Sequence, residues 1–249
     1  CTWQAIRLVI LMYARTPPPG WTSPPAPPAT PPPMTPAATL TFVGAAAGCQ
    51  STMVRQSSPD ADYAHVAGLW WDGGDSSRGG IDAVLIQFTD LFGAGTQHIA
   101  AHEAIVHAKL VYQIDLTSST SALGSPADLY EVNVPWTAPG TTWTSFTGAF
   151  GLHHELGNYV GVAAASATGT GQMHWNEVDV SASINRWKAD PSLNMGWIFY
   201  PGTPPAGGSW TDGAQLQGCA AAAGKQIYLE VSYTLTPPTP PAPPAPPPS

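Results

Sequence analysis

The chain has 249 residues, of which only 10% are charged, and it contains 28 prolines, 25 glycines and 10 tryptophans. Its formal net charge of −8 argues against a nucleic-acid-binding protein, which needs a basic surface to contact phosphate groups. The length predicts one domain of ordinary size with tails, and the low charge with abundant Thr, Ser, Gly and Trp is typical of an extracellular β-module.

The N-terminal segment, residues 1–15, is apolar over residues 5–14, which read AIRLVILMYA. This run is half as long as the roughly 20 apolar residues that a membrane span requires, so no membrane span is predicted. Two interpretations stay open. The run is either the remnant of a signal-peptide core or a strand or short helix that packs on another surface.

Two proline-rich tracts flank the predicted folded domain, an arm at residues 16–37 and a tail at residues 237–249. Such tracts adopt the polyproline II conformation and cannot enter a sheet interior, because proline lacks the N–H donor. The arm can extend roughly 60 Å, at about 3.1 Å per residue, and so can reach a neighbouring molecule. The simpler alternative is that both tracts are spacers or disordered linkers.

Residues 38–236 are predicted to form an all-β domain around the two runs 83–88 and 104–115. The first run is uniformly apolar and fits a central strand, while the second alternates with the period of two that is typical of a half-buried strand. We expect the pair at the middle of an antiparallel, jelly-roll-like β-sandwich. Further strands are predicted at residues 39–43, 64–71, 129–134, 160–165, 175–180, 196–200 and 227–234, and one short helix at residues 181–188.

The chain has three cysteines, Cys1, Cys49 and Cys219. Cys49 opens the folded region and Cys219 precedes its last strand, so a disulfide between them would tie the two ends of the domain together in an oxidising compartment. The alternative is a pair of buried free thiols. Cys1 is then left free or paired with another chain.

A loop rich in Gly, Asp and Ser carries the candidate metal ligands Asp72, Asp75 and Asp82. Hard cations bind carboxylates and backbone carbonyls, which a flexible loop can supply, so these residues form a candidate structural calcium site. The alternative is that they are turn aspartates that cap their own backbone. No other cofactor and no catalytic residue is predicted, and the chain is predicted not to be an enzyme.

Tryptophan can stack on sugar rings or fill a core. Trp70 and Trp71 must point to opposite faces of a strand, so one of them is expected to be exposed, and Trp210 lies in the loop GGSWTDG. These three are the candidate carbohydrate-binding residues, although a core position is the alternative for each. Trp187 and Trp197 are predicted to lie in the core.

Five segments occur in an order that resembles a known family. They read LIQF (85–88), AIVHAKLVYQ (104–113), VNVPWTAPGTTW (132–143), WNEVDVSASINRW (175–187) and MGWIF (195–199). Together they resemble the DNRLRE-type β-sandwich domain of secreted and cell-surface proteins, over residues 54–234. The arginine-bearing signature of that family is not matched, because IDAVLIQF stands in its place. The resemblance implies a carbohydrate-binding or adhesive module.

The proline tracts resemble the hydroxyproline-rich glycoproteins of plant and algal walls, of the extensin and pherophorin kind. This resemblance implies prolines that are hydroxylated and carry covalent O-glycans. The candidate sites are Pro17, Pro18, Pro19, Pro24, Pro25, Pro27, Pro28, Pro31, Pro32, Pro33, Pro36, Pro237, Pro238, Pro240, Pro241, Pro243 and Pro244.

These observations lead to one expected function and one main alternative. We expect a structural subunit of an extracellular filament, cell wall or cell-surface assembly, which associates with identical subunits through its N-terminal segment and glycosylated proline arms. The alternative is a carbohydrate-binding or adhesive module that is tethered by the proline tracts and has a polysaccharide as its partner. A polysaccharide lyase or hydrolase is a third hypothesis, which no constellation of residues supports.

Overall fold

The computed structural model describes residues 38–73, 80–114, 126–147, 159–168, 175–201 and 213–234. The chain divides into two units, Cys1–Met34 and Thr35–Ser249, and every described residue belongs to the second. The predictions for the N-terminal segment, both proline tracts, Cys1, Asp75 and Trp210 lie outside the described residues.

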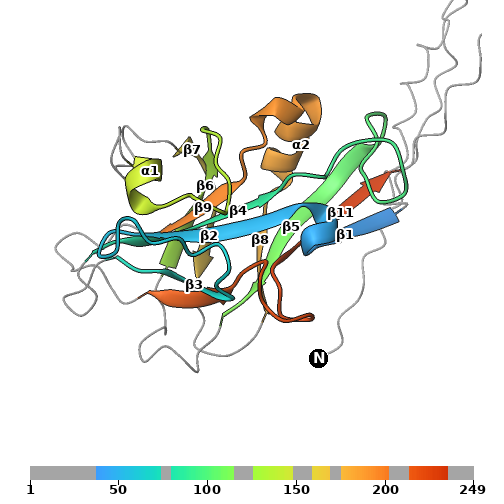
Figure 1. The fold of residues 1–249 in the computed structure, drawn as a ribbon. Coiled ribbons are helices and arrows are strands. Elements are labelled where there is room, and N and C mark those ends of the chain that lie inside the picture. Colours follow the sequence, from blue (N-terminus) through green and yellow to red (C-terminus); the bar gives the residue numbers. More distant parts are fainter. Residues whose placement is uncertain are drawn as a thin grey trace, which may run out of the picture. The chain divides into compact units, whose positions relative to one another are not determined.

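Antiparallel sheets pack on one another and confirm the predicted β-sandwich (Figure 1). The four-stranded sheet has the order β1-β11-β5-β8, formed by Ala38–Val43, Tyr228–Thr234, Ala104–Gln113 and Trp175–Asp179. The five-stranded sheet has the order β2-β4-β9-β6-β7, formed by Cys49–Arg55, Asp82–Phe88, Trp197–Pro201, Pro126–Val132 and Tyr159–Thr168. A small third sheet pairs β10 (Ala214–Gln217) with β3 (Gly68–Trp71).

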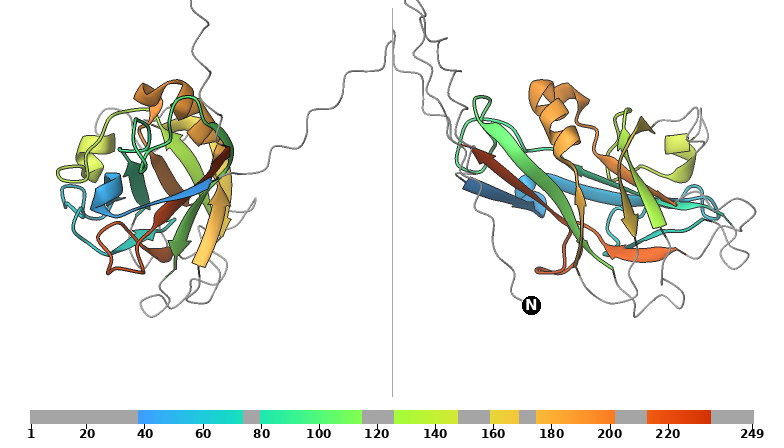
Figure 2. Two further views of the ribbon diagram at one scale, coloured as in Figure 1. Left: turned by 90° about the vertical axis from the view of Figure 1, so that its right-hand side faces the viewer. Right: turned by 180° about the vertical axis from the view of Figure 1, so that it is seen from behind.

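Helical segments connect the strands. The α-helices are α1 (Trp143–Thr147) and α2 (Ser181–Ala189), and the 3-10 helices are η1 (Ala45–Ala47) and η2 (Pro191–Leu193). The views in Figure 2 show α2 in orange, well apart from α1 in yellow-green. Within the described ranges, no helix has the length and apolar character needed to cross a bilayer.

The main core lies between the sheets and is centred on aromatic side chains. Trp71 of β3 stacks on Phe199 of β9, with ring centroids 5.5 Å apart, and meets Tyr112 of β5 edge-on at 6.3 Å. Tyr112 and Phe199 also meet edge-on, at 5.2 Å. Each such contact adds about 1 kcal/mol to the burial of the rings themselves. The cluster therefore joins all three sheets at one place.

A second core covers the opposite face of the five-stranded sheet. Val54, Leu85 and Ile198 point to this side, where Trp136 and Phe146 pack with them. Phe146 belongs to α1, so this helix and the loop before it form the cover. Every residue of β4 is buried as a result, which explains why the predicted run 83–88 shows no polar face.

The two runs at the centre of the sequence prediction belong to different sheets, since β4 lies in the five-stranded sheet and β5 in the four-stranded one. The predicted alternation along β5 is confirmed, because Ala108, Leu110 and Tyr112 are buried while His107 is exposed. Val106 breaks the pattern and is exposed. It lies opposite a register shift between Ser232 and Tyr233, where β5 has one residue more than β11.

The disulfide between Cys49 and Cys219 is confirmed. Cys49 is the first residue of β2, and Cys219 follows β10, with a Cα–Cα distance of 5.8 Å. The backbone N–H of Cys219 also donates to Ser51 Oγ at 2.9 Å. The disulfide therefore links the five-stranded sheet to the segment that leads into the last strand.

Helix α2 begins at the predicted residue and runs one residue further than predicted. Trp187 packs against Trp197 of β9, with ring centroids 4.5 Å apart, and both are fully buried as predicted. Ser183 Oγ donates to Glu131 Oε1 at 2.6 Å and accepts from Trp197 Nε1 at 3.1 Å. Arg186 forms an ion pair with Glu131. These contacts fix α2 to β6 and β9 of the five-stranded sheet.

Candidate functional site

The loop predicted to bind calcium is described only in part. Asp72 and Asp82 are buried and form a backbone bridge, in which each N–H donates to the other carbonyl, at 3.0 and 2.9 Å. The Asp82 carboxylate forms an ion pair with Arg55 at 2.9 Å, so a cation already neutralises it. Within the described ranges, three or more His, Cys, Asp or Glu side chains do not gather into a group that could hold a metal ion. Asp75 is not described, and the calcium site stays a prediction.

The predicted carbohydrate-binding tryptophans have different positions. Trp71 is fully buried in the main core, so the prediction that it contacts a sugar is wrong. Trp70 points to the other side of β3 and is half-buried, packed against the edge of that core. The described residues do not include Trp210, which stays a prediction.

The four-stranded sheet has one face in the core and one face towards solvent. Residues that are direct partners on neighbouring strands point to the same side of a sheet, so the register defines this second face. We call it the open sheet face. It consists of Thr39, Thr41 and Val43 on β1, Tyr228, Glu230 and Ser232 on β11, His107, Lys109, Val111 and Gln113 on β5, and Trp175, Glu177 and Asp179 on β8.

An exposed tryptophan lies at one end of the open sheet face. Trp175 is the first residue of β8 and is 41% exposed. Its ring meets that of Tyr228 edge-on, with centroids 5.4 Å apart. Because β5 lies between β8 and β11, the two rings meet above β5, where Val111 of the same face is only 4% exposed. Trp175 is therefore an exposed aromatic ring with a fixed orientation.

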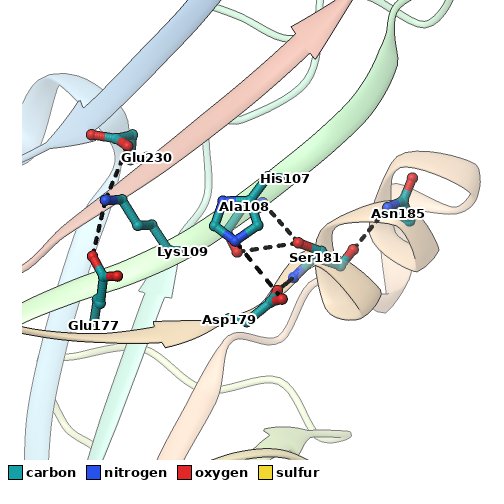
Figure 3. Close-up of polar contacts among 8 residues, drawn as sticks. All are labelled: His107, Ala108, Lys109, Glu177, Asp179, Ser181, Asn185 and Glu230. Atoms are coloured by element: carbon teal, nitrogen blue, oxygen red, sulfur yellow. Dashed lines mark hydrogen bonds and ion pairs between the residues drawn. The ribbon is translucent and has the colours of Figure 1, made fainter. Parts of the chain in front are cut away.

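An ion-pair network occupies the middle of the same face, as Figure 3 shows. Lys109 Nζ lies 2.9 Å from Glu177 Oε2 and 3.3 Å from Glu230 Oε1, so it bridges the strands on either side of β5. The hydrogen bond to Glu177 raises the pKa of Lys109, with partial burial acting against it and Glu230 adding to it. Lys109 stays charged and is held by both carboxylates.

The junction between β8 and α2 completes the site (Figure 3). Val180 N–H donates to the Ala108 carbonyl at 2.9 Å, and Ala108 N–H donates to Ser181 Oγ at 2.8 Å, so a side chain extends the ladder where the helix begins. Hydrogen bonds from the Ser181 hydroxyl and N–H lower the pKa of Asp179, and His107, whose Nε2 lies 3.8 Å from Asp179 Oδ2, lowers it further. Asp179 is therefore ionised at neutral pH.

Two hollows elsewhere offer fewer groups for binding. The first, of about 510 Å³, lies in the loop before α1, where Thr141 Oγ1 donates to the Thr137 carbonyl and Thr137 Oγ1 to that of Pro139. The second, of about 620 Å³, lies between residues 92–102 and the end of α2, where Lys188 Nζ donates to the Ala101 carbonyl. In both, these polar side chains are bonded within the protein itself, whereas the open sheet face combines an exposed ring with charged groups at the surface.

A scan of the sequence against protein-family models gives no match, and a search of curated proteins gives no significant match. The resemblances to DNRLRE-type domains and to hydroxyproline-rich glycoproteins therefore stay predictions. The open sheet face is the described feature with the most specific chemistry.

Proposed function

We propose that the β-sandwich is a carbohydrate-binding, adhesive module of a secreted cell-wall or cell-surface glycoprotein, with the open sheet face as its binding surface. The observation that carries this proposal is the exposed Trp175 ring, braced edge-on by Tyr228. One face of a sugar ring is formed by C–H groups, and it packs on an aromatic ring that keeps its polar edge in water. The sequence resemblance to carbohydrate-binding sandwiches supports the same function.

The rest of the face suits an extended glycan. Hydroxyl side chains line β1 and β11, where Thr39 Oγ1 and Ser232 Oγ lie 3.0 Å apart. Such groups can donate to and accept from sugar hydroxyls. The face spans four strands, and strands lie about 4.8 Å apart, so it is wide enough for several sugar units.

The extracellular setting is part of the proposal. A disulfide between Cys49 and Cys219 is compatible with an oxidising compartment. The proline tracts at residues 16–37 and 237–249 have the composition of O-glycosylated wall proteins, as argued from the sequence. They would tether the binding module to the wall or surface.

Trp175→Ala tests the binding surface. We expect it to weaken glycan binding about tenfold or more, because the most important contact residues of an interface often contribute that much, and to leave folding intact because the ring is partly exposed. Affinity electrophoresis in gels containing laminarin, xyloglucan, arabinogalactan, polygalacturonate or alginate measures the retention. Leu193→Ala is the matched control, since Leu193 is an exposed apolar side chain on η2. Equal retention of native and Trp175→Ala protein would refute this surface.

We propose as a second function that the chain is a structural subunit of an extracellular filament or wall assembly, and that it associates with identical subunits through residues 1–15 and the glycosylated proline arms. Two observations favour it. The first residue of β1, Ala38, pairs with Tyr233 near the end of β11. The strand that follows the proline arm and the strand that precedes the proline tail therefore lie side by side at one end of the four-stranded sheet. In addition, β1 lies at the edge of that sheet and has a described strand on one side only. Such an edge can accept a strand from another molecule.

Deleting residues 1–37 tests this second function. We expect a folded monomer that no longer assembles, because β1 stays intact while the arm is lost. Sedimentation velocity on the native and truncated proteins measures the assembly, and a chain that lacks residues 240–249 is the control for loss of length alone. Assembly that is unchanged after the deletion would rule out the role of the arm.

A further inference from the structure

We propose that the open sheet face selects neutral glycans and rejects acidic ones, because carboxylates surround its single lysine. This inference rests on the proposed glycan-binding function and adds the class of ligand. On the described strands of this face, the carboxylates of Glu177, Asp179 and Glu230 stand against the ammonium of Lys109. These three carboxylates outnumber the cationic groups of the face even if His107 is counted with Lys109, so the face carries an excess of negative charge.

The lysine has its charge already compensated within the protein. Its Nζ is held at 2.9 Å by Glu177 and at 3.3 Å by Glu230, and Asp179 is its direct partner on β8. An ammonium has three N–H donors, so a sugar carboxylate could accept only from the third, close to carboxylates that repel it. The ammonium has no uncompensated charge to offer it.

The difference in exposure between the lysine and the carboxylates adds to the repulsion of an anionic ligand. The Lys109 side chain is 25% exposed, whereas those of Glu177 and Asp179 are 65% and 64% exposed. A ligand that approaches from solvent thus meets the two carboxylates before it meets the ammonium. The most exposed of these charges are negative, so they repel an approaching anionic ligand.

The carboxylates also lie close to the ring that would hold the sugar. Glu177 follows Trp175 by two residues on β8, so both side chains point to the same side at about 6.7 Å spacing. This spacing is shorter than the screening length of about 8 Å at physiological ionic strength. A uronate stacked on Trp175 would be repelled by Glu177 even in physiological salt.

Matched pairs of polymers test the proposal, because each pair shares a backbone and differs in its carboxylates. The pairs are methyl-esterified and free polygalacturonate, carboxyl-reduced and native alginate, and laminarin and carboxymethyl-laminarin. Retention of the full chain is measured by affinity electrophoresis, with a chelator present so that calcium cannot bridge carboxylates. We expect the native protein to retain the neutral member of any pair whose backbone it binds, and not the acidic member.

The variant Glu177→Gln/Glu230→Gln supplies the second measurement. Glutamine keeps an acceptor for Lys109 and removes the negative charge, so the variant should gain retention on the acidic polymers. We expect about fivefold for each charge removed, the factor given by one charge pair at about 4 Å in water, and a smaller gain in high salt. Asp60→Asn is the control, because Asp60 is an exposed carboxylate outside the face.

The outcomes separate this inference from the function on which it rests. Retention of the acidic member as strongly as the neutral one, lost in Trp175→Ala, overturns the selectivity and leaves glycan binding in place. Neutral retention with no gain in the double variant overturns the role of the two glutamates. If no polymer is retained by the native protein, the proposed glycan-binding function fails, and the inference fails with it.

Discussion

Replacing Cys49 and Cys219 with serine should lower the free energy of unfolding by about 5 kcal/mol. The disulfide joins residues 170 positions apart, and the entropy that a cross-link removes from the unfolded chain grows with the logarithm of that separation. A loop of this length gives about 5 kcal/mol in the chain-entropy estimate, which is comparable to the whole stability of many domains. We therefore expect a variant that is marginally folded at 25 °C.

Urea unfolding of the native protein and of Cys49→Ser/Cys219→Ser, followed by tryptophan fluorescence, measures this difference. Cys1→Ser is the control, because it removes a sulfur atom and leaves the disulfide intact. The native protein in reductant should behave like the double variant. A loss below about 1 kcal/mol would mean that the cross-link does little to restrain the unfolded chain.

The sequence predicts the sandwich well where a strand has two different faces. Along β5, the buried Ala108, Leu110 and Tyr112 alternate with His107 and Lys109, and this pattern is a local property of the strand. Along β4 every residue is buried, and a uniformly apolar run correctly indicates a strand covered on both sides. The pairing is not local, and this is why the sequence did not separate β4 and β5 into different sheets.

The sequence alone does not determine which tryptophans are buried and which are exposed. Alternation puts Trp70 and Trp71 on opposite sides of β3, but only the packing of β3 against Phe199 decides that Trp71 is the buried one. A better signal was present in WNEVDV. Val178 and Val180 are buried, so Trp175 shares the polar side with Glu177 and Asp179. The alternation that predicts β8 also predicts that Trp175 faces solvent.

Other parts of the site depend on contacts between distant segments. Lys109 meets Glu177 and Glu230 only because β5 lies between β8 and β11 in this register, and no spacing in the sequence encodes that order. The short strand β10 was not predicted, since its four residues have no pattern without their partner β3. Helix α1 was not predicted either, because a five-residue helix depends on the packing of Phe146 rather than on periodicity.

Trp71→Ala should lower the free energy of unfolding by about 3–5 kcal/mol, the range for removing a large aromatic side chain from a core. Trp71 is fully buried, stacks on Phe199 and meets Tyr112 edge-on, so its loss leaves a cavity where the three sheets join. Trp175→Ala is the matched comparison, because it removes the same side chain from the open sheet face.

Urea unfolding monitored by circular dichroism, with affinity electrophoresis on the same samples, separates the two positions. We expect Trp71→Ala to lose stability and, wherever it remains folded, to retain glycan as the native protein does. We expect Trp175→Ala to lose retention, with a smaller loss of stability than Trp71→Ala, because the Trp175 ring is 41% exposed and its removal leaves no enclosed cavity. Retention that is kept in Trp175→Ala but lost in folded Trp71→Ala would mean that the sugar does not bind at Trp175 of the open sheet face.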